Sequence, residues 1–151
     1  HGQETLAVDL LLQEECPGWM YQVKRGATTI WERWDAERPD GTVNESSQNG
    51  SNMVSFNHYA FGAVGRFYYE YLLGIRPAAP GFARVRVAPV CDWRLGGVSG
   101  SYESRAGRIA VAWRYTDGGL AVEVETPVET ELRLPGRPPR TIPAGTYREV
   151  L

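Results

Sequence analysis

The chain has 151 residues, of which 42% are hydrophobic and 23% charged, and its formal net charge is −2. This composition excludes a disordered tail, and the small net charge argues against a nucleic acid as partner. No apolar run approaches the roughly 18 residues of a membrane span, so no membrane partner is expected. The two cysteines, Cys16 and Cys91, are too few and too far apart in sequence for a metal or redox motif. We therefore expect no metal and no cofactor, and the compartment stays open.

The first predicted element is a helix over about residues 3–15. Its apolar side chains recur at helical spacing; these are Leu6, Ala7, Leu10 and Leu11. Pro17-Gly18 ends the helical pattern. The stretch 19–35 is rich in aromatic and β-branched residues and too short for two helices, which favours a loop and an extended segment. If residues 28–34 are extended, Glu32 shares a face with Ile30 and Trp34.

Residues 36–53 contain Asp40-Gly41, Asn49-Gly50 and almost no apolar side chains, which predicts a long polar loop. Ser55 is a suitable cap for a helix that runs to about Gly74. This helix carries two apolar faces, which are Phe56, Ala60, Ala63, Phe67 and Tyr71 on one side and Phe61, Val64, Tyr68 and Leu72 on the other. A helix of this kind needs apolar partners on two sides, as in a layered helical barrel.

From residue 76 the pattern changes to alternation. Short apolar-polar runs contain Val85 and Val87; Ile109, Val111 and Trp113; Leu120, Val122 and Val124; Leu132 and Leu134. They are separated by turn residues at a spacing of roughly 8–12, which is typical of antiparallel strands in a sandwich. The second half is therefore predicted to be all-β.

Two segments carry the chemistry. One is Thr28-Thr29-Ile30-Trp31-Glu32-Arg33-Trp34-Asp35, and the other is Ser55-Phe56-Asn57-His58-Tyr59-Ala60-Phe61-Gly62. A carboxylate between two indoles with an imidazole downstream is the mixture that sugar sites use, because aromatic faces pack on sugar CH groups while carboxylates and imidazole handle hydroxyls and protons. The pattern indicates carbohydrate chemistry.

Both segments resemble the closing part of the catalytic domain of bacterial α-L-rhamnosidases, which are inverting glycoside hydrolases with an α/α barrel. Residues 102–109 and 143–147 resemble the small C-terminal β-domain of the same enzymes. The resemblance implies an α+β chain, in which residues 1–75 supply the terminal helices of an (α/α)6 barrel and residues 76–151 form a C-terminal antiparallel β-sandwich. It also implies a C-terminal fragment whose general acid lies upstream.

Glu32 matches the position that serves as general base in that family. Glycoside hydrolysis needs two carboxyl groups, so Glu32 alone cannot catalyse the reaction. The ordinary alternative is a surface glutamate paired with Arg33 or Arg25. Asp35 is a second candidate for the base, although its place at the start of a polar loop suits a turn better.

The expected substrate-binding residues are His58, Trp34 and Trp31. His58 matches a family histidine that contacts the sugar, while a histidine satisfied within the core is the ordinary alternative. In the first turn of the helix predicted to begin near Ser55, the imidazole is expected to be neutral and to hydrogen-bond. Both indoles can stack under a sugar or pack in a core, and Trp34 is the better candidate for stacking. Asn57 is expected to brace the loop.

The function implied by the resemblance is hydrolysis of terminal α-L-rhamnosyl residues by single displacement, with a rhamnose-containing carbohydrate as partner and no cofactor. Alternatives are another α/α-barrel glycosidase, a polysaccharide lyase, or a non-catalytic sugar-binding or scaffolding domain. The chain is expected to show no turnover alone. It is also expected to form a dimer that buries one face of the helix 55–74, through Phe61, Val64, Tyr68 and Leu72.

Overall fold

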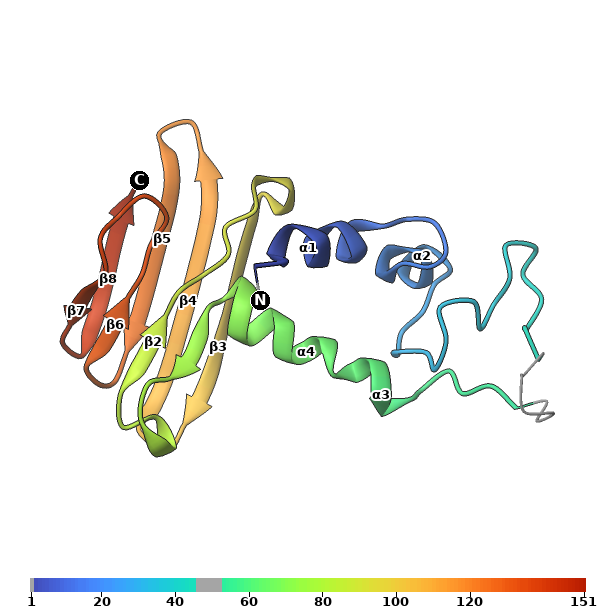
Figure 1. The fold of residues 1–151 in the computed structure, drawn as a ribbon, viewed down its shortest axis with the longest axis horizontal. Coiled ribbons are helices and arrows are strands. Elements are labelled where there is room, and N and C mark those ends of the chain that lie inside the picture. Colours follow the sequence, from blue (N-terminus) through green and yellow to red (C-terminus); the bar gives the residue numbers. More distant parts are fainter. Residues whose placement is uncertain (1, 46–52) are drawn as a thin grey trace. The chain divides into compact units, whose positions relative to one another are not determined.

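The computed structural model describes residues 2–45 and 53–151, which divide into two compact units, His1–Val64 and Gly65–Leu151. The helices are α1 (Glu4–Leu12), α2 (Trp19–Lys24), α3 (Tyr59–Gly62) and α4 (Val64–Phe67), followed by a π-helical turn at Tyr68–Leu72 (Figure 1). The strands are β1 (Ile75–Pro77), β2 (Val85–Val87), β3 (Gly97–Ser104), β4 (Gly107–Thr116), β5 (Gly119–Thr126), β6 (Thr130–Leu132), β7 (Arg140–Ile142) and β8 (Gly145–Val150). Two 3₁₀ turns lie at Pro80–Phe82 and Trp93–Leu95.

Helix α1 is present where the apolar spacing predicts it, but its predicted stripe is not buried. Leu6 is 62% and Leu10 39% exposed, whereas Val8 is fully buried. The helix ends at Leu12 because Gln13 adopts an extended conformation, three residues before the predicted end. The buried side of α1 is therefore the one that carries Val8, and not the one that carries Leu6 and Leu10.

Helix α2 corrects the prediction that residues 19–35 are loop and extended segment. Residues 19–24 form a helix in which Tyr21 and Gln22 are buried. Burial of these side chains outweighs the strand preference of the aromatic residues, which is a weak and context-dependent bias. Residues 28–34 contain two bends and the start of a turn and form no strand, so the extended segment predicted there is also wrong.

The helix predicted over residues 55–74 begins later and is divided. It starts at Tyr59 with His58 as its N-cap, and α3, α4 and the π-helical turn follow one another. Ser55 does not cap it, because its hydroxyl bonds to Asn57 instead. The predicted end at Gly74 agrees with its φ of +72°, and a Cβ there would overlap the backbone of Ala88.

The predicted polar loop is described only at its two ends. Residues 36–45 are irregular apart from one bridge between Glu37 and Val43. Asn49-Gly50 and the rest of residues 46–52 lie outside the described residues.

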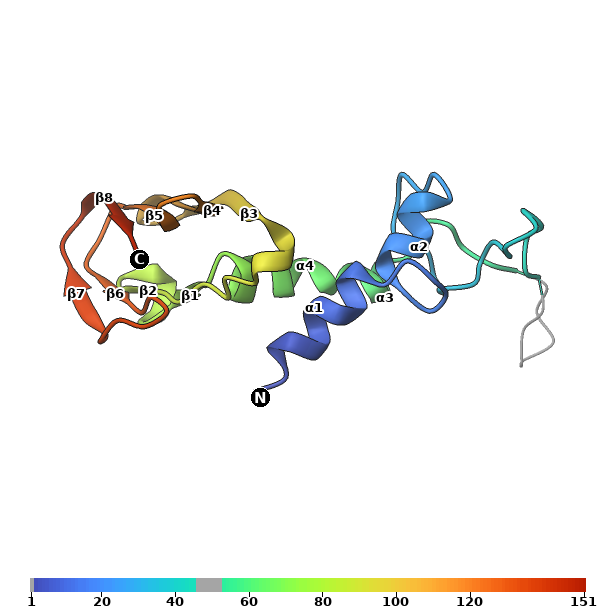
Figure 2. The ribbon, with the colours of Figure 1, turned by 90° about the horizontal axis from the view of Figure 1, so that it is seen from above.

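The second unit contains two four-stranded sheets that face each other (Figure 2). Their strand orders are β1-β2-β6-β7 and β3-β4-β5-β8, and all pairs are antiparallel except β2 and β6, which run parallel. Alternating side chains of both sheets fill one core that includes Val85, Val87, Ile109, Trp113 and Val124. A sandwich follows a helical segment, which confirms the α+β fold class.

The sandwich core also holds the end of the π-helical turn. Trp113 Nε1 donates to Leu72 O at 2.7 Å, which satisfies the indole of a ring that is 2% exposed. Along the described ranges, every helix is too short or too polar to cross a lipid bilayer.

Candidate functional site

The two chemistry-bearing segments, which residues 36–54 separate in the sequence, lie side by side in the structure. Glu32 N donates to Ser55 O at 2.9 Å, and His58 N donates to Ile30 O at 2.9 Å. The Thr29 hydroxyl also donates to Phe56 O. These bonds join the two segments in an antiparallel arrangement that is not a regular strand pair. They satisfy backbone groups of segments that are bent and not paired as strands.

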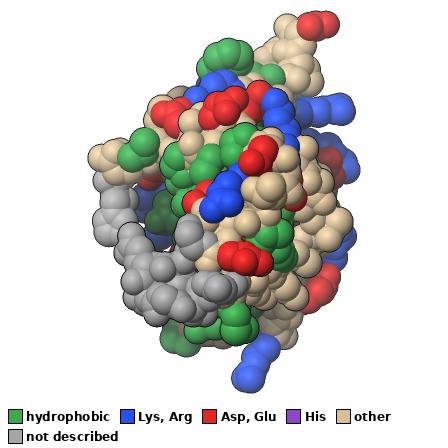
Figure 3. Space-filling view, turned by 90° about the vertical axis from the view of Figure 1, so that its right-hand side faces the viewer, with side chains coloured by type: hydrophobic (Ala, Val, Ile, Leu, Met, Phe, Trp, Pro, Cys, Tyr) green, Lys and Arg blue, Asp and Glu red, His purple; other side chains and the backbone are tan. Residues whose placement is uncertain are grey.

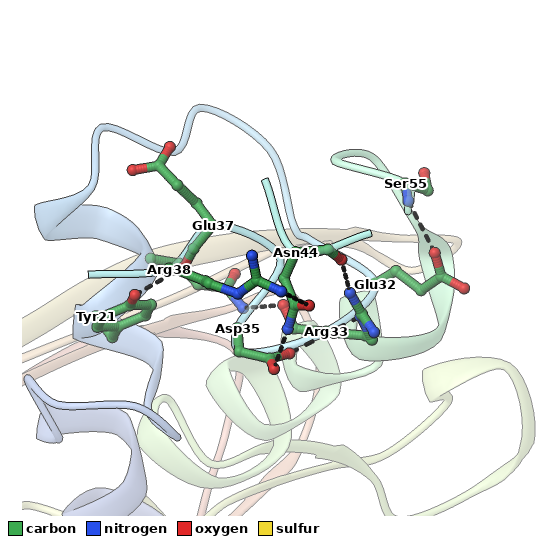
Figure 4. Close-up of polar contacts among 9 residues, drawn as sticks. Tyr21, Glu32, Arg33, Asp35, Glu37, Arg38, Asn44 and Ser55 are labelled. Atoms are coloured by element: carbon green, nitrogen blue, oxygen red, sulfur yellow. Dashed lines mark hydrogen bonds and ion pairs between the residues drawn. The ribbon is translucent and has the colours of Figure 1, made fainter. Parts of the chain in front are cut away.

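The Glu32 side chain turns back onto the second segment. Its Oε2 accepts a hydrogen bond from Ser55 N–H at 2.8 Å, and Figure 4 shows the carboxylate directed to Ser55 and away from Asp35. No arginine pairs with it among the described residues, since Arg25 pairs with Glu37 and Arg33 lies near Asp35. The glutamate is therefore not the arginine-paired surface carboxylate considered as its ordinary alternative.

The Gln22 side chain contacts the backbone on both sides of Glu32. This side chain is 2% exposed, and its two ends contact the residues on either side of Glu32. Its Oε1 accepts from Trp31 N at 3.4 Å, and its Nε2 donates to Arg33 O at 3.5 Å. Sequence reasoning missed Gln22, although a lone amide among the aromatic side chains of residues 19–23 is a usable signal for a buried polar contact.

Asn44 is the second buried polar residue near Glu32, with 6% exposure. Its Nδ2 donates to Asp35 Oδ2 at 2.6 Å, its Oδ1 accepts from Arg38 at 2.8 Å, and its carbonyl accepts from Arg33 (Figure 4). Asp35 is thus bound to its own loop, which favours the turn role over a catalytic one. Nothing in the sequence distinguishes Asn44 from other loop asparagines.

The neighbouring loop is held by Tyr21. Burial raises the pKa of Tyr21 above its ordinary value, so the phenol stays protonated and donates to Glu37 O at 2.7 Å.

The two indoles beside Glu32 have different surroundings. Trp31 is 4% exposed and packs edge-on against Phe56, with ring centroids 5.2 Å apart. Its burial favours a packing role, and a sugar contact through Trp31 stays a prediction. Trp34 is only partly buried; it stacks on Phe61 at 4.9 Å and meets Trp19 edge-on at 4.6 Å. Of the two rings, Trp34 is the one with accessible surface.

His58 combines a capping contact with partial exposure. Its Nδ1 accepts from Ala60 N–H at 3.3 Å, and its ring stacks on Tyr59 with centroids 5.3 Å apart. An Nδ1 that accepts a hydrogen bond places the proton of a neutral imidazole on Nε2. His58 therefore offers an N–H donor on the side away from the helix, which suits a sugar hydroxyl.

The face predicted to form a dimer is not a free apolar surface. Leu72 is 4% exposed and belongs to the buried residues of the second unit, while Phe61 packs on Trp34 and Trp19. The proposed dimer has no support in these positions.

Acidic, basic and apolar side chains are interspersed on the face that Figure 3 shows. Within residues 2–45 and 53–151, no three His, Cys, Asp or Glu side chains gather in a group that could hold a metal ion.

Comparisons with known proteins match both parts of the chain. Residues 1–72 match the model described as the bacterial alpha-L-rhamnosidase 6 hairpin glycosidase domain, and residues 74–149 match the bacterial alpha-L-rhamnosidase C-terminal domain. An alpha-L-rhamnosidase of Alteromonas sp. (strain LOR) is 38% identical over 126 residues, which are 83% of this chain and 13% of that protein. The chain spans 12–14% of the length of the three curated relatives compared.

Two solved structures have the same fold as this chain. The native α-L-rhamnosidase from Aspergillus terreus has a TM-score of 0.83 and 32% identity, covering 92% of this chain and 16% of its own. The Streptomyces avermitilis alpha-L-rhamnosidase complexed with L-rhamnose has a TM-score of 0.84 and 27% identity, covering 97% of this chain and 16% of its own.

Proposed function

Because this chain belongs to the bacterial α-L-rhamnosidase family, we propose that it forms part of an enzyme that hydrolyses terminal α-L-rhamnosyl residues of glycosides or polysaccharides. In this proposal residues 1–75 belong to the catalytic α/α barrel and residues 76–151 form the accompanying β-sandwich. The observation that supports it most directly is the Glu32 carboxylate, which is held by Ser55 N–H and carries no arginine partner among the described residues.

Glu32 acts as the general base. Its Oε2 is held by the Ser55 amide, which fixes the direction of the carboxylate while Oε1 remains available to take a proton from water. The activated water attacks the anomeric carbon in a single displacement, so the product has the inverted configuration. A carboxylic acid about 6.5–9.5 Å away protonates the leaving oxygen in such enzymes, and we assign it to sequence outside these residues.

His58 and Trp34 contact the sugar. The Nε2–H of His58 donates to a rhamnose hydroxyl, since Nδ1 is engaged with Ala60. The exposed part of Trp34 packs on the apolar face of the sugar, supported from behind by Phe61 and Trp19. Trp31 supports the Glu32 peptide from the core rather than touching the substrate.

A test of this proposal follows the stereochemistry of the reaction. A longer enzyme that contains this chain is mixed with an aryl α-L-rhamnoside, and the anomeric proton of the released sugar is recorded by NMR before mutarotation. Inversion predicts that β-L-rhamnose is released first. Initial release of the α-anomer would reject the single displacement, and absence of rhamnose release would favour the non-catalytic sugar-binding alternative.

A further inference from the structure

A shallow cavity of about 570 Å³ lies in the second unit, wholly outside the site of Glu32. It is lined by the segment Pro77–Phe82, by Tyr102 and by Arg105. Pro77 belongs to β1 and Tyr102 to β3, which are edge strands of the two sheets, so the cavity lies at an edge of the sandwich.

Two aromatic rings, Phe82 and Tyr102, line this cavity, and Tyr69 lies next to Tyr102 outside the lining. Tyr102 is 40% exposed, with its ring centroid 5.0 Å from that of Phe82 at 36° and 6.3 Å from that of Tyr69 at 70°. Phe82 packs on the sandwich core, which holds its ring in place. Tyr69 and Tyr102 are exposed at the surface. The phenol hydroxyls of these two tyrosines make no hydrogen bond with the described part of the chain.

The backbone that presents Phe82 is in a costly conformation. Phe82 has a φ of +62° and follows Gly81, whose φ is +66°. A bulky residue in the left-handed region is rare, and strained backbone of this kind concentrates at ligand sites.

Arg105 supplies the charged group. It lies in the turn between β3 and β4, and no described carboxylate pairs with it. The neighbouring Arg108, in contrast, pairs with Glu103 and Glu125. An unpaired guanidinium presents five N–H donors in one plane, which can donate to adjacent hydroxyl groups.

We propose that Phe82, Tyr102 and Arg105 form an accessory saccharide-binding site, which takes a pyranose unit of the enzyme's carbohydrate substrate. Two aromatic rings, one of which carries a hydroxyl, and one multidentate donor suit a ligand that has both apolar CH faces and many hydroxyls. A shallow site at an edge of the sandwich admits one unit of a longer chain. The inference rests on the proposed function for its ligand class, but not on Glu32.

The test is a titration of this chain with methyl α-L-rhamnopyranoside and with an α-linked rhamnose disaccharide, followed by backbone amide NMR. We expect saturable shifts at residues 77–82 and 102–105, with a Kd on the order of 1 mM for the disaccharide. Arg105→Ala, in an exposed turn, should weaken binding at least tenfold without affecting folding. Tyr102→Ala should do the same, and Trp93→Ala is the matched control because this 73% exposed ring is not part of the cavity lining.

Three outcomes would overturn the site: no saturable shift up to about 50 mM sugar, far above that Kd; shifts confined to residues 28–62; or unchanged affinity in the Arg105→Ala variant. Binding here together with an unimpaired Glu32→Gln enzyme would leave this site standing and reject only the assignment of Glu32.

Discussion

Cys16 and Cys91 show how the surroundings of a thiol change its chemistry. Cys16 is exposed, whereas burial raises the pKa of the partly buried Cys91 to about 12. At about pH 8 the Cys91 thiol is therefore protonated and unreactive. Loss of solvent and the Asp35 charge also raise the pKa of Cys16, so it should react more slowly than a free cysteine. We predict that a disulfide reagent modifies Cys16 in the native chain and Cys91 only after unfolding; a Cys16→Ser variant with a rapidly reacting thiol would contradict this.

Gln22 makes a second prediction at this scale. Gln22→Leu removes the contacts to Trp31 N and Arg33 O, which leaves a buried N–H and a partly buried carbonyl without their partner. The expected loss of stability is about 1–3 kcal/mol in urea unfolding. Gln3→Leu, at an exposed glutamine, is the control and should change stability by less than about 0.5 kcal/mol. An equal effect of both substitutions would show that Gln22 does not hold the Glu32 peptide.

These buried amides mark the limit of sequence reasoning about the site. Glu32 and His58 stand out because their residue types and neighbours are unusual, so both could be singled out as candidates. The contacts of Gln22 and Asn44 depend on chain segments 11 and 9 residues away, respectively. No periodicity encodes such contacts, which arise only when the loops have folded.

At the scale of elements, Gly74 separates the π-helical turn from β1. A Cβ at this position would lie 2.2 Å from the carbonyl carbon of Ala88, and its φ of +72° disfavours any L side chain. We predict that Gly74→Ala destabilises the second unit by more than about 2 kcal/mol in thermal or urea unfolding.

The matched control for Gly74→Ala is Gly65→Ala, which lies inside α4 with no atom within 4 Å of the added methyl. Alanine is favoured over glycine in a helix by up to about 1 kcal/mol, so this change should be neutral or stabilising. A Gly74→Ala protein as stable as Gly65→Ala would refute the close packing inferred at Gly74.

The second unit should also be sensitive to acid through Glu131. Hydrogen bonds from Arg86 and Arg133 lower the pKa of Glu131 below its ordinary value of 4.5. A depressed folded-state pKa contributes stability that is present above the unfolded pKa and is lost as pH falls through the folded pKa. We predict that the urea concentration at the unfolding midpoint of this unit decreases as the pH is lowered below about 4.5. Glu131→Gln should make this decrease smaller. Glu129→Gln, whose ion pair with Arg84 is more than half exposed, is the control; the same effect there would contradict the assignment.

The elements themselves were predicted unevenly for physical reasons. The long strands β4 and β5 bury every second residue, and that alternation is legible in the sequence. Helix α2 was missed because burial of Tyr21 and Gln22 decides its conformation, and local propensity does not. The parallel pairing of β2 with β6 joins residues about 45 apart, which alternation cannot specify.

On the scale of the whole molecule, the chain consists of a small unit that carries Glu32 and a sandwich with the larger buried core. Among the described residues of the first unit, the buried cluster consists of Tyr21, Trp31 and Ala36, so hydrogen bonds between segments matter more there. The bond from Ser55 to the Glu32 carboxylate therefore serves both the local fold and the proposed chemistry.

The most direct test of the account is the kcat of Glu32→Gln in a longer enzyme that contains this chain, measured with an aryl α-L-rhamnoside. Glutamine keeps the hydrogen bond to Ser55 N–H but cannot take a proton from water, so kcat should fall at least about 100-fold while KM changes little. Azide, which needs no deprotonation, should partly restore turnover and give the β-azide. Asp35→Asn, at the carboxylate bound to Asn44, is the matched control and should keep most of the activity. A Glu32→Gln enzyme that retains more than about a tenth of its kcat, well short of the 100-fold loss expected without a general base, would contradict the account, and a collapse in Asp35→Asn instead would move the base to Asp35.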